Sequence, residues 1–161
     1  MANPLGLFER IVRRATEHTQ PRAEPEEEIH PFDFRDIHPK LPEVVRSLFD
    51  DGHYAQASFE AFKFIDNQIQ SLTGESESGF KLMMRVFQES SPLIQLTPCQ
   101  TTSERDEQKG YQFLFAGSVL AIRNPRGHKH SVKDDPDICM DHLSLASLLL
   151  RRLEKSGYKI K

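Results

Sequence analysis

The sequence predicts an all-α protein: a helical bundle of about four or five helices, preceded by a separate amphipathic helix and a linker. Apolar residues recur at helical spacing over most of the chain, whereas no stretch alternates convincingly in the manner of a strand. A segment rich in proline and glutamate separates the first apolar run from the others. The 161 residues are enough for one ordinary domain and an extension.

We divide the chain into an extension, residues 1–31, and a helical domain, residues 32–161. Apolar residues in the extension lie among charged ones at helical spacing, which indicates a short amphipathic helix. We expect this helix to pack on the domain; the alternatives are docking to a partner or a second copy, and lying on a membrane surface. We interpret residues 20–31 as the linker, because this segment is rich in proline and glutamate. Prolines make such a segment stiff, and repulsion between the glutamates keeps it extended. The apolar residues of the helix are Leu5, Leu7, Phe8, Ile11 and Val12.

The first half of the domain is expected to hold three helices. After an irregular start at 32–40, apolar residues repeat at helical spacing over 41–49, with a proline in the first turn. An Asp-Asp-Gly break leads into a long helix over 54–72, which ends before a glycine. A third helix covers 80–87 and stops before a proline. Residues 93–103 have no firm period, which indicates a loop or a brief extended piece.

The second half of the domain is expected to hold two helices. The first covers 104–123, with the hydroxyl of Ser103 as its cap. Because a residue before proline is pushed out of the helical region, Asn124 is predicted to be a helix boundary. A loop over 133–137 then starts the last helix, which ends in basic residues before a glycine.

Composition and missing motifs exclude several functions. A formal net charge of -3 and a pI of about 6.2 argue against a protein that coats nucleic acid through its overall field. Two distant cysteines without a CxxC or a signal peptide fit a reducing compartment, so we expect a cytoplasmic protein with no membrane partner. The residues required for a phosphate-binding loop, a dinucleotide fold, a zincin or a hydrolase elbow are not in the sequence.

Potential metal ligands gather near the start of the last helix. They include an H-x-H and a C-x-x-H, and imidazole with thiolate suits zinc. The gap between the two pairs is not a stereotyped zinc spacing, and a buried cysteine acting as a small apolar residue explains Cys139 more simply. We therefore predict no metal and no cofactor. The residues concerned are His128, His130, Cys139, Asp141 and His142.

The densest functional stretch runs from Arg123 to His130. Metal-free cleavage of RNA requires a group that exchanges a proton near neutral pH and a cation that stabilises the phosphate. Histidine and arginine have those properties. With Arg123 at a helix end and His128 just beyond it, both side chains can reach one groove, and Asn124 can orient the imidazole or the phosphate. These three residues are the predicted catalytic set.

This stretch resembles the catalytic motif of the HEPN superfamily, R-x(4–6)-H, in which many members are metal-independent ribonucleases. Residues 51–55, 60–63 and 115–128 more particularly resemble the Ymh-like branch of HEPN proteins, and the likeness covers residues 32–161. The resemblance implies a helical fold and a homodimer in which two protomers line one cleft. It also implies a role in phage defence or a toxin–antitoxin system, with an antitoxin or a larger defence complex as a possible partner.

The spacing alone is weak, because Arg13 and His18 also satisfy R-x4-H in the extension without a core helix or a following asparagine. Among lesser candidates, Glu60 could brace Arg123, although pairing with Lys63 is the simpler interpretation.

Residues after the motif extend the candidate surface. Arg126, Lys129 and His130 are predicted substrate-binding residues that would contact phosphates. No aromatic residue stands beside this basic stretch in the sequence, so the grip on RNA would be weak or would come from a partner. The predicted function is an endoribonuclease effector; the alternative is a non-catalytic helical interaction or dimerisation module of a larger defence complex.

Overall fold

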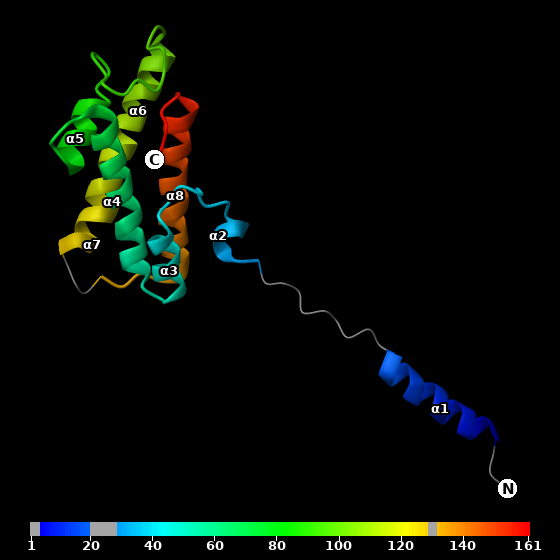
Figure 1. The fold of residues 1–161 in the computed structure, drawn as a ribbon. Helices are drawn as coiled ribbons and strands as arrows, with labels where there is room; N and C mark the ends of the chain where they lie inside the picture. Colours follow the sequence, from blue (N-terminus) through cyan, green and yellow to red (C-terminus); the bar gives the residue numbers. More distant parts are fainter. Residues whose placement is uncertain (1–3, 20–28, 129–131) are drawn as a thin grey trace.

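The structure, a computed structural model, describes residues 4–19, 29–128 and 132–161. In these ranges it contains helices and no strand, which confirms the all-α prediction and fits a helical bundle. Figure 1 shows α4, α5, α6 and α8 gathered around one core. In chain order, the elements are α1 Pro4–Thr19, α2 Pro31–Phe34, α3 Glu43–Asp50, α4 Tyr54–Thr73, α5 Gly79–Val86, α6 Thr102–Ser118, η1 Val119–Arg123, α7 Asn124–His128 and α8 Pro136–Lys155.

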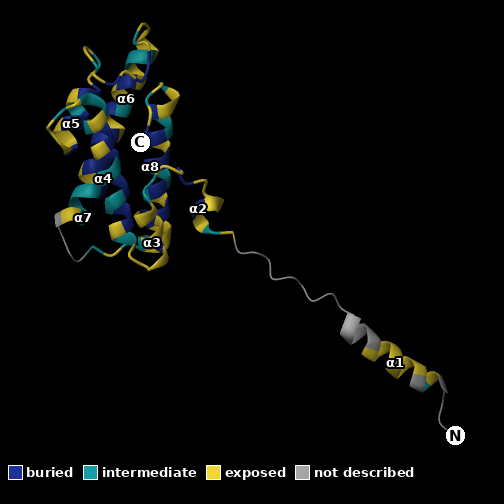
Figure 2. Ribbon diagram, viewed as in Figure 1, coloured by how far each residue is buried: buried dark blue, intermediate teal, exposed yellow. Residues whose placement is uncertain are grey.

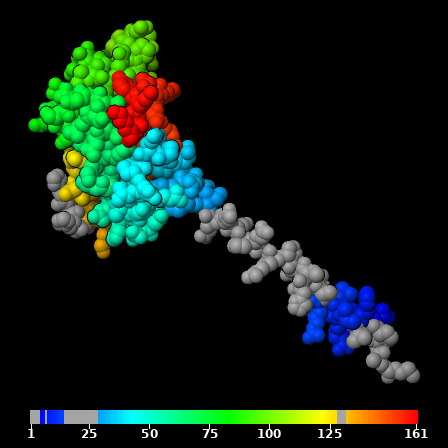
Figure 3. Space-filling view, viewed as in Figure 1, coloured from blue at the N-terminus to red at the C-terminus, as the bar shows by residue number. Residues whose placement is uncertain are grey.

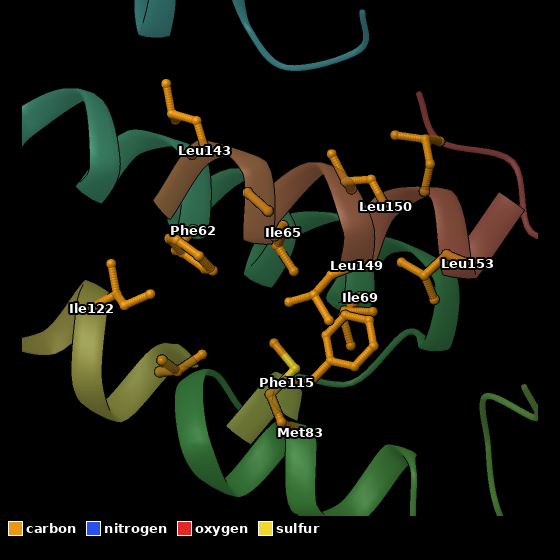
Figure 4. Packing of buried hydrophobic residues seen from close by; sticks show 14 of the residues in the cluster. Phe62, Ile65, Ile69, Met83, Phe115, Ile122, Leu143, Leu149, Leu150 and Leu153 are labelled. Atoms are coloured by element: carbon orange, nitrogen blue, oxygen red, sulfur yellow. The ribbon is translucent and has the colours of Figure 1, made fainter. Parts of the chain in front are cut away.

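The centre of the core is the contact between α4 and α8. Figure 4 shows apolar side chains of both helices meeting, with side chains of α5 and α6 closing the space on one side. The inner faces of these helices are buried and the outer faces exposed, as Figure 2 shows, which is the amphipathic arrangement that the sequence period predicts. The labelled core residues are Phe62, Ile65, Ile69, Met83, Phe115, Ile122, Leu143, Leu149, Leu150 and Leu153.

Two details at helix starts differ from the sequence prediction. The predicted irregular start contains the short helix α2, which has a proline at its first position and the ring of His30 accepting the Phe32 N–H. The prediction that Ser103 caps α6 is wrong. Thr101 is the cap, because Glu104 stands three residues after it and the two residues exchange side-chain and backbone hydrogen bonds as a capping box.

The predicted helix boundary at Asn124 is also wrong. The helix continues from α6 through the π-helix η1 into α7, and Asn124 has helical dihedral angles. Pro125 lacks an N–H, and in an ordinary α-helix its ring would clash with the carbonyl four residues earlier. The wider π-turn, in which the Asn124 N–H bonds the Val119 carbonyl, makes room for this proline. Arg123 therefore lies inside a continuous helix.

The amphipathic helix α1 is present, but the expectation that it packs on the domain is wrong for this structure. Phe8 and Ile11 are 67% and 58% exposed. In Figure 3, α1 stands clear of the helical domain. Docking to a partner or a second copy stays a prediction. No described helix combines the length and the apolar content that crossing a bilayer requires.

A buried glutamine ties the connection between α5 and α6 to the bundle. Gln108 is 0% exposed, and its side-chain oxygen accepts the Leu96 N–H at 2.7 Å. Its amide nitrogen donates to the carbonyls of Phe87 and Ile94 at 3.1 and 3.0 Å. One side chain therefore satisfies three backbone groups of a segment that has no regular structure of its own.

Gln108→Leu is expected to lower the free energy of unfolding by about 2–5 kcal/mol, because it leaves three buried backbone groups without partners. Gln95→Leu, at an exposed glutamine of the same connection, should change it by less than about 0.5 kcal/mol. Urea denaturation followed by circular dichroism measures both. Equal values for the two variants would contradict the role given to Gln108.

Candidate functional site

Arg123 is held by a carboxylate that the sequence prediction missed. Asp66 of α4 is 2% exposed; one of its oxygens accepts the Gly79 N–H at 2.7 Å, and the other lies 3.6 Å from Nη2 of Arg123. Gly79 has φ +71, and an added Cβ would lie 3.5 Å from Nη1 of Arg123. Three elements, α4, α5 and η1, thus meet at this guanidinium.

Arg126, three residues further on, has a different environment. Its Nε and Nη2 donate to the two oxygens of Asp134 at 2.6 and 2.7 Å, and its Nη1 donates to the Ile122 carbonyl at 2.9 Å. The side chains of Arg126 and Asp134 are only 9% and 5% exposed. This bidentate pair joins α7 to the segment before α8, so the geometry favours a structural role for Arg126 rather than the predicted contact with substrate.

Arg123, by contrast, keeps donors for a ligand. Within the described residues, its Nη1 donates to the side-chain oxygen of Asn124 at 3.4 Å, and its buried Nε has no hydrogen-bond partner. A hollow of about 140 Å³ opens beside it, lined by Phe59, Arg123, Asn124 and Gly127. A guanidinium with spare N–H groups at the edge of a hollow is suited to hold an anion.

The other predicted residues are placed as follows. Asn124 lines the hollow, and His128 ends α7 four residues later, a spacing that brings two helix positions onto one face. The side chain of His128, and all of Lys129 and His130, lie outside the described part of the structure. The sequence therefore predicted two of the four residues that line the hollow and missed Phe59 and Gly127.

Within the described residues, Glu60 forms no ion pair with Arg123. It pairs with Lys63 at 3.1 Å, as the simpler interpretation has it, and Asp66 supplies the carboxylate instead. Glu60 and Asp66 are six residues apart on α4. The sequence did contain a signal for Asp66: it lies at helical spacing among the apolar residues Phe62, Ile65 and Ile69. A carboxylate on the apolar side of a helix requires a partner.

Two of the potential metal ligands near α8, Cys139 and His142, lie together beside Ser58 of α4, whereas Asp141 is exposed and pairs with Arg35. The Ser58 hydroxyl lies 3.1 Å from Nδ1 of His142 and 3.6 Å from Sγ of Cys139. Burial raises the pKa of the Cys139 thiol, and burial and the nearby Arg126 lower the pKa of His142. Both shifts favour the neutral forms. In the described residues, no three His, Cys, Asp or Glu side chains are grouped to hold a metal ion.

Residues 52–55, which carry part of the likeness noted in the sequence, line a second hollow with Arg126 and Asp134, of about 510 Å³. A family model described as "Protein of unknown function (Hypoth_ymh)" matches residues 35–153, most of the chain. The chain belongs to the Hypoth_ymh family. No curated protein and no solved structure matches it. The Ymh-like part of the resemblance is thus confirmed, and the two arginines of the site lie within the matched region of this Hypoth_ymh protein.

The buried pair predicts a large difference between two Asp→Asn variants. Asp134→Asn should lower the free energy of unfolding by about 3–5 kcal/mol, because it leaves the buried Arg126 without its counter-charge. Asp141→Asn removes the same charge from a pair with Arg35, in which the Asp141 side chain is 70% exposed and the Arg35 side chain 44%. This variant should change the free energy of unfolding by no more than about 1 kcal/mol. Urea denaturation at neutral pH compares them; a similar small effect for both would show that the Arg126–Asp134 pair does not hold α7.

Proposed function

We propose that this Hypoth_ymh protein is a metal-independent endoribonuclease of the HEPN type, acting in the cytoplasm as a toxin or phage-defence effector. One observation carries the proposal: Arg123 is fixed by a buried carboxylate yet its side chain is 26% exposed beside a hollow, while Arg126 is 9% exposed and has its donors occupied. Such an arginine is held in place before the ligand arrives, which is the condition for stabilising charge that develops in a transition state. The HEPN assignment itself rests on the sequence resemblance.

The reaction follows from the residue types. The ribose 2′-oxygen attacks the neighbouring phosphorus as the bond from phosphorus to the 5′-oxygen breaks, giving a 2′,3′-cyclic phosphate and a 5′-hydroxyl. His128 takes the proton from the 2′-hydroxyl or gives one to the leaving oxygen. Arg123 stabilises the charge on the phosphate oxygens, and Asn124, which accepts from Arg123 at 3.4 Å, orients it. No metal takes part in these steps.

A second copy of the chain would complete the site. The outer face of α6 and η1 carries Phe113, Leu114 and Leu120, which are 54%, 45% and 49% exposed. Gly117 lies between Leu114 and Leu120 in the chain and Gly110 precedes Phe113, and nothing stands within 4 Å of a Cβ built at either glycine. This apolar face with small residues permits close approach of a second helix, and it leads directly into Arg123 and Asn124. If two such faces pair, the result is a homodimer with one composite cleft. In that cleft one His128 acts as the base and the His128 of the second copy acts as the acid.

Cleavage of labelled RNA in excess EDTA tests the proposal. His128→Ala is expected to reduce the rate by about 10²–10⁴-fold, because the proton-transfer group is lost. Arg123→Ala should reduce it by about 10²–10³-fold through lost stabilisation of the phosphate charge. Arg13→Ala and His18→Ala, at the equally spaced pair in the extension, are the matched controls and should retain full activity.

Expression in growing cells should arrest growth for the wild type and not for Arg123→Ala. If the wild type and His128→Ala are equally inert toward RNA as well-folded dimers, the ribonuclease proposal is wrong. The chain would then be a non-catalytic dimerisation module, in which Arg123 binds a phosphate or a partner carboxylate. Activity that disappears in EDTA would contradict the metal-independent mechanism.

The dimer has its own test. Leu120→Glu places a charge in the centre of the apolar face and should yield a monomer in size-exclusion chromatography with light scattering, with cleavage reduced at least about tenfold. Leu148→Glu is the matched control, since Leu148 is 48% exposed against 49% for Leu120 but lies on α8. Unchanged mass and cleavage in Leu120→Glu would place the interface elsewhere.

A further inference from the structure

The hollow beside Arg123 has room for one flat ring. Its volume is about 140 Å³, and a protein cavity of about 150 Å³ holds a benzene molecule. Its four lining residues are a phenyl ring, a guanidinium, a carboxamide and a glycine. One wall is therefore apolar and flat, and two others, Arg123 and Asn124, carry hydrogen-bonding side chains, a combination that suits a planar polar ring.

Phe59, the apolar wall, takes no part in the core. It is half-buried, whereas the core cluster and the partly buried apolar residues packed against it include its neighbours Phe62 and Phe64 but not Phe59. The Nζ of Lys63 lies 5.7 Å from the centre of its ring. An aromatic residue beside cations but outside the core is the arrangement on which nucleobases stack in proteins that bind single strands.

Gly127 allows this ring to lie against α7. A Cβ added at Gly127 would be 2.8 Å from Cε2 of Phe59, which is closer than two non-bonded carbon atoms can approach. Gly127 sits inside a helix, where alanine would ordinarily be the better residue. The glycine therefore permits the contact that forms the floor of the hollow, in the same helical turn that carries the candidate catalytic residues.

We propose that Phe59 is the stacking platform of a nucleobase subsite and that the substrate is single-stranded RNA. The inference rests on the proposed ribonuclease function, because Arg123 would hold the phosphate of the nucleotide whose base lies on Phe59. A base in a duplex is stacked between its neighbours and is not available to this ring, so an unpaired strand or loop is required. Because every base can stack on an aromatic ring, the subsite distinguishes unpaired from paired RNA more strongly than it distinguishes one base from another.

Binding to a non-cleavable strand tests the subsite separately from catalysis. The probe is a fluorescein-labelled 2′-O-methyl RNA of mixed sequence, which has no free 2′-hydroxyl to attack the phosphate. Phe59→Leu keeps an apolar side chain but loses the flat ring, and should bind about 5- to 150-fold more weakly in fluorescence anisotropy. Phe34→Leu, at a phenylalanine of α2 that is 76% exposed, should bind as the wild type does. Thermal melting verifies that both variants fold.

Two further variants examine the ring directly. The chain has no tryptophan, so Phe59→Trp introduces a single indole whose fluorescence should be quenched by the single strand and not by the same strand in a duplex. Gly127→Ala should weaken binding by a factor similar to that of Phe59→Leu, because its methyl group displaces the ring.

The outcomes separate the two proposals. Binding that depends on Phe59 without any cleavage by the wild type would overturn the ribonuclease and leave the subsite standing. Cleavage by the wild type with unchanged binding in Phe59→Leu, or an indole that is not quenched, would overturn the subsite alone. A wild type that binds no single strand overturns both, and quenching by free nucleotide equal to that by the strand would replace RNA with a mononucleotide ligand.

Discussion

The candidate site depends on the burial of Asp66. A carboxylate that is 2% exposed is strongly destabilising unless both oxygens find partners, and it finds them in the Gly79 N–H and the guanidinium of Arg123. Because those partners belong to α5 and η1 while Asp66 belongs to α4, the three elements must meet at this point. The interaction that satisfies a buried charge thereby also sets the position of the arginine.

The path of the helix through Pro125 has a similar double effect. A proline in the middle of a helix removes a hydrogen bond and crowds the preceding turn, yet the π-turn from Val119 to Arg123 absorbs both effects and lets α7 continue. Wider turns of this kind are frequent at functional sites, since they shift side chains relative to a regular helix. Here the shifted residues are Arg123 and Asn124, at the edge of the hollow.

The two arginines of this region divide structural and ligand-binding roles. Arg126 and Asp134 form a buried bidentate pair that joins α7 to the start of α8, so the positive charge of Arg126 is neutralised inside the protein. Arg123 is only partly satisfied and faces the hollow with Phe59. For a chain whose net charge is -3, attraction to RNA cannot come from the overall field. A single oriented cation with an aromatic neighbour is a local solution to that problem.

The sequence by itself determined the main helices of the domain and the R-N-x3-H segment, because apolar period, proline and glycine act through local backbone geometry. The predicted linker falls mainly on residues 20–28, which lie outside the described part of the structure. The end of α4 before Gly74 is such a case. Only the tertiary structure decided which charges pair: Asp66 rather than Glu60 faces Arg123, and Asp134 occupies Arg126. It also brought Phe59 beside Gly127, which are 68 residues apart in the chain and so beyond any local pattern. Local propensity depends on neighbours along the chain, whereas a site depends on neighbours in space, and those are set by how the apolar faces of the helices pack.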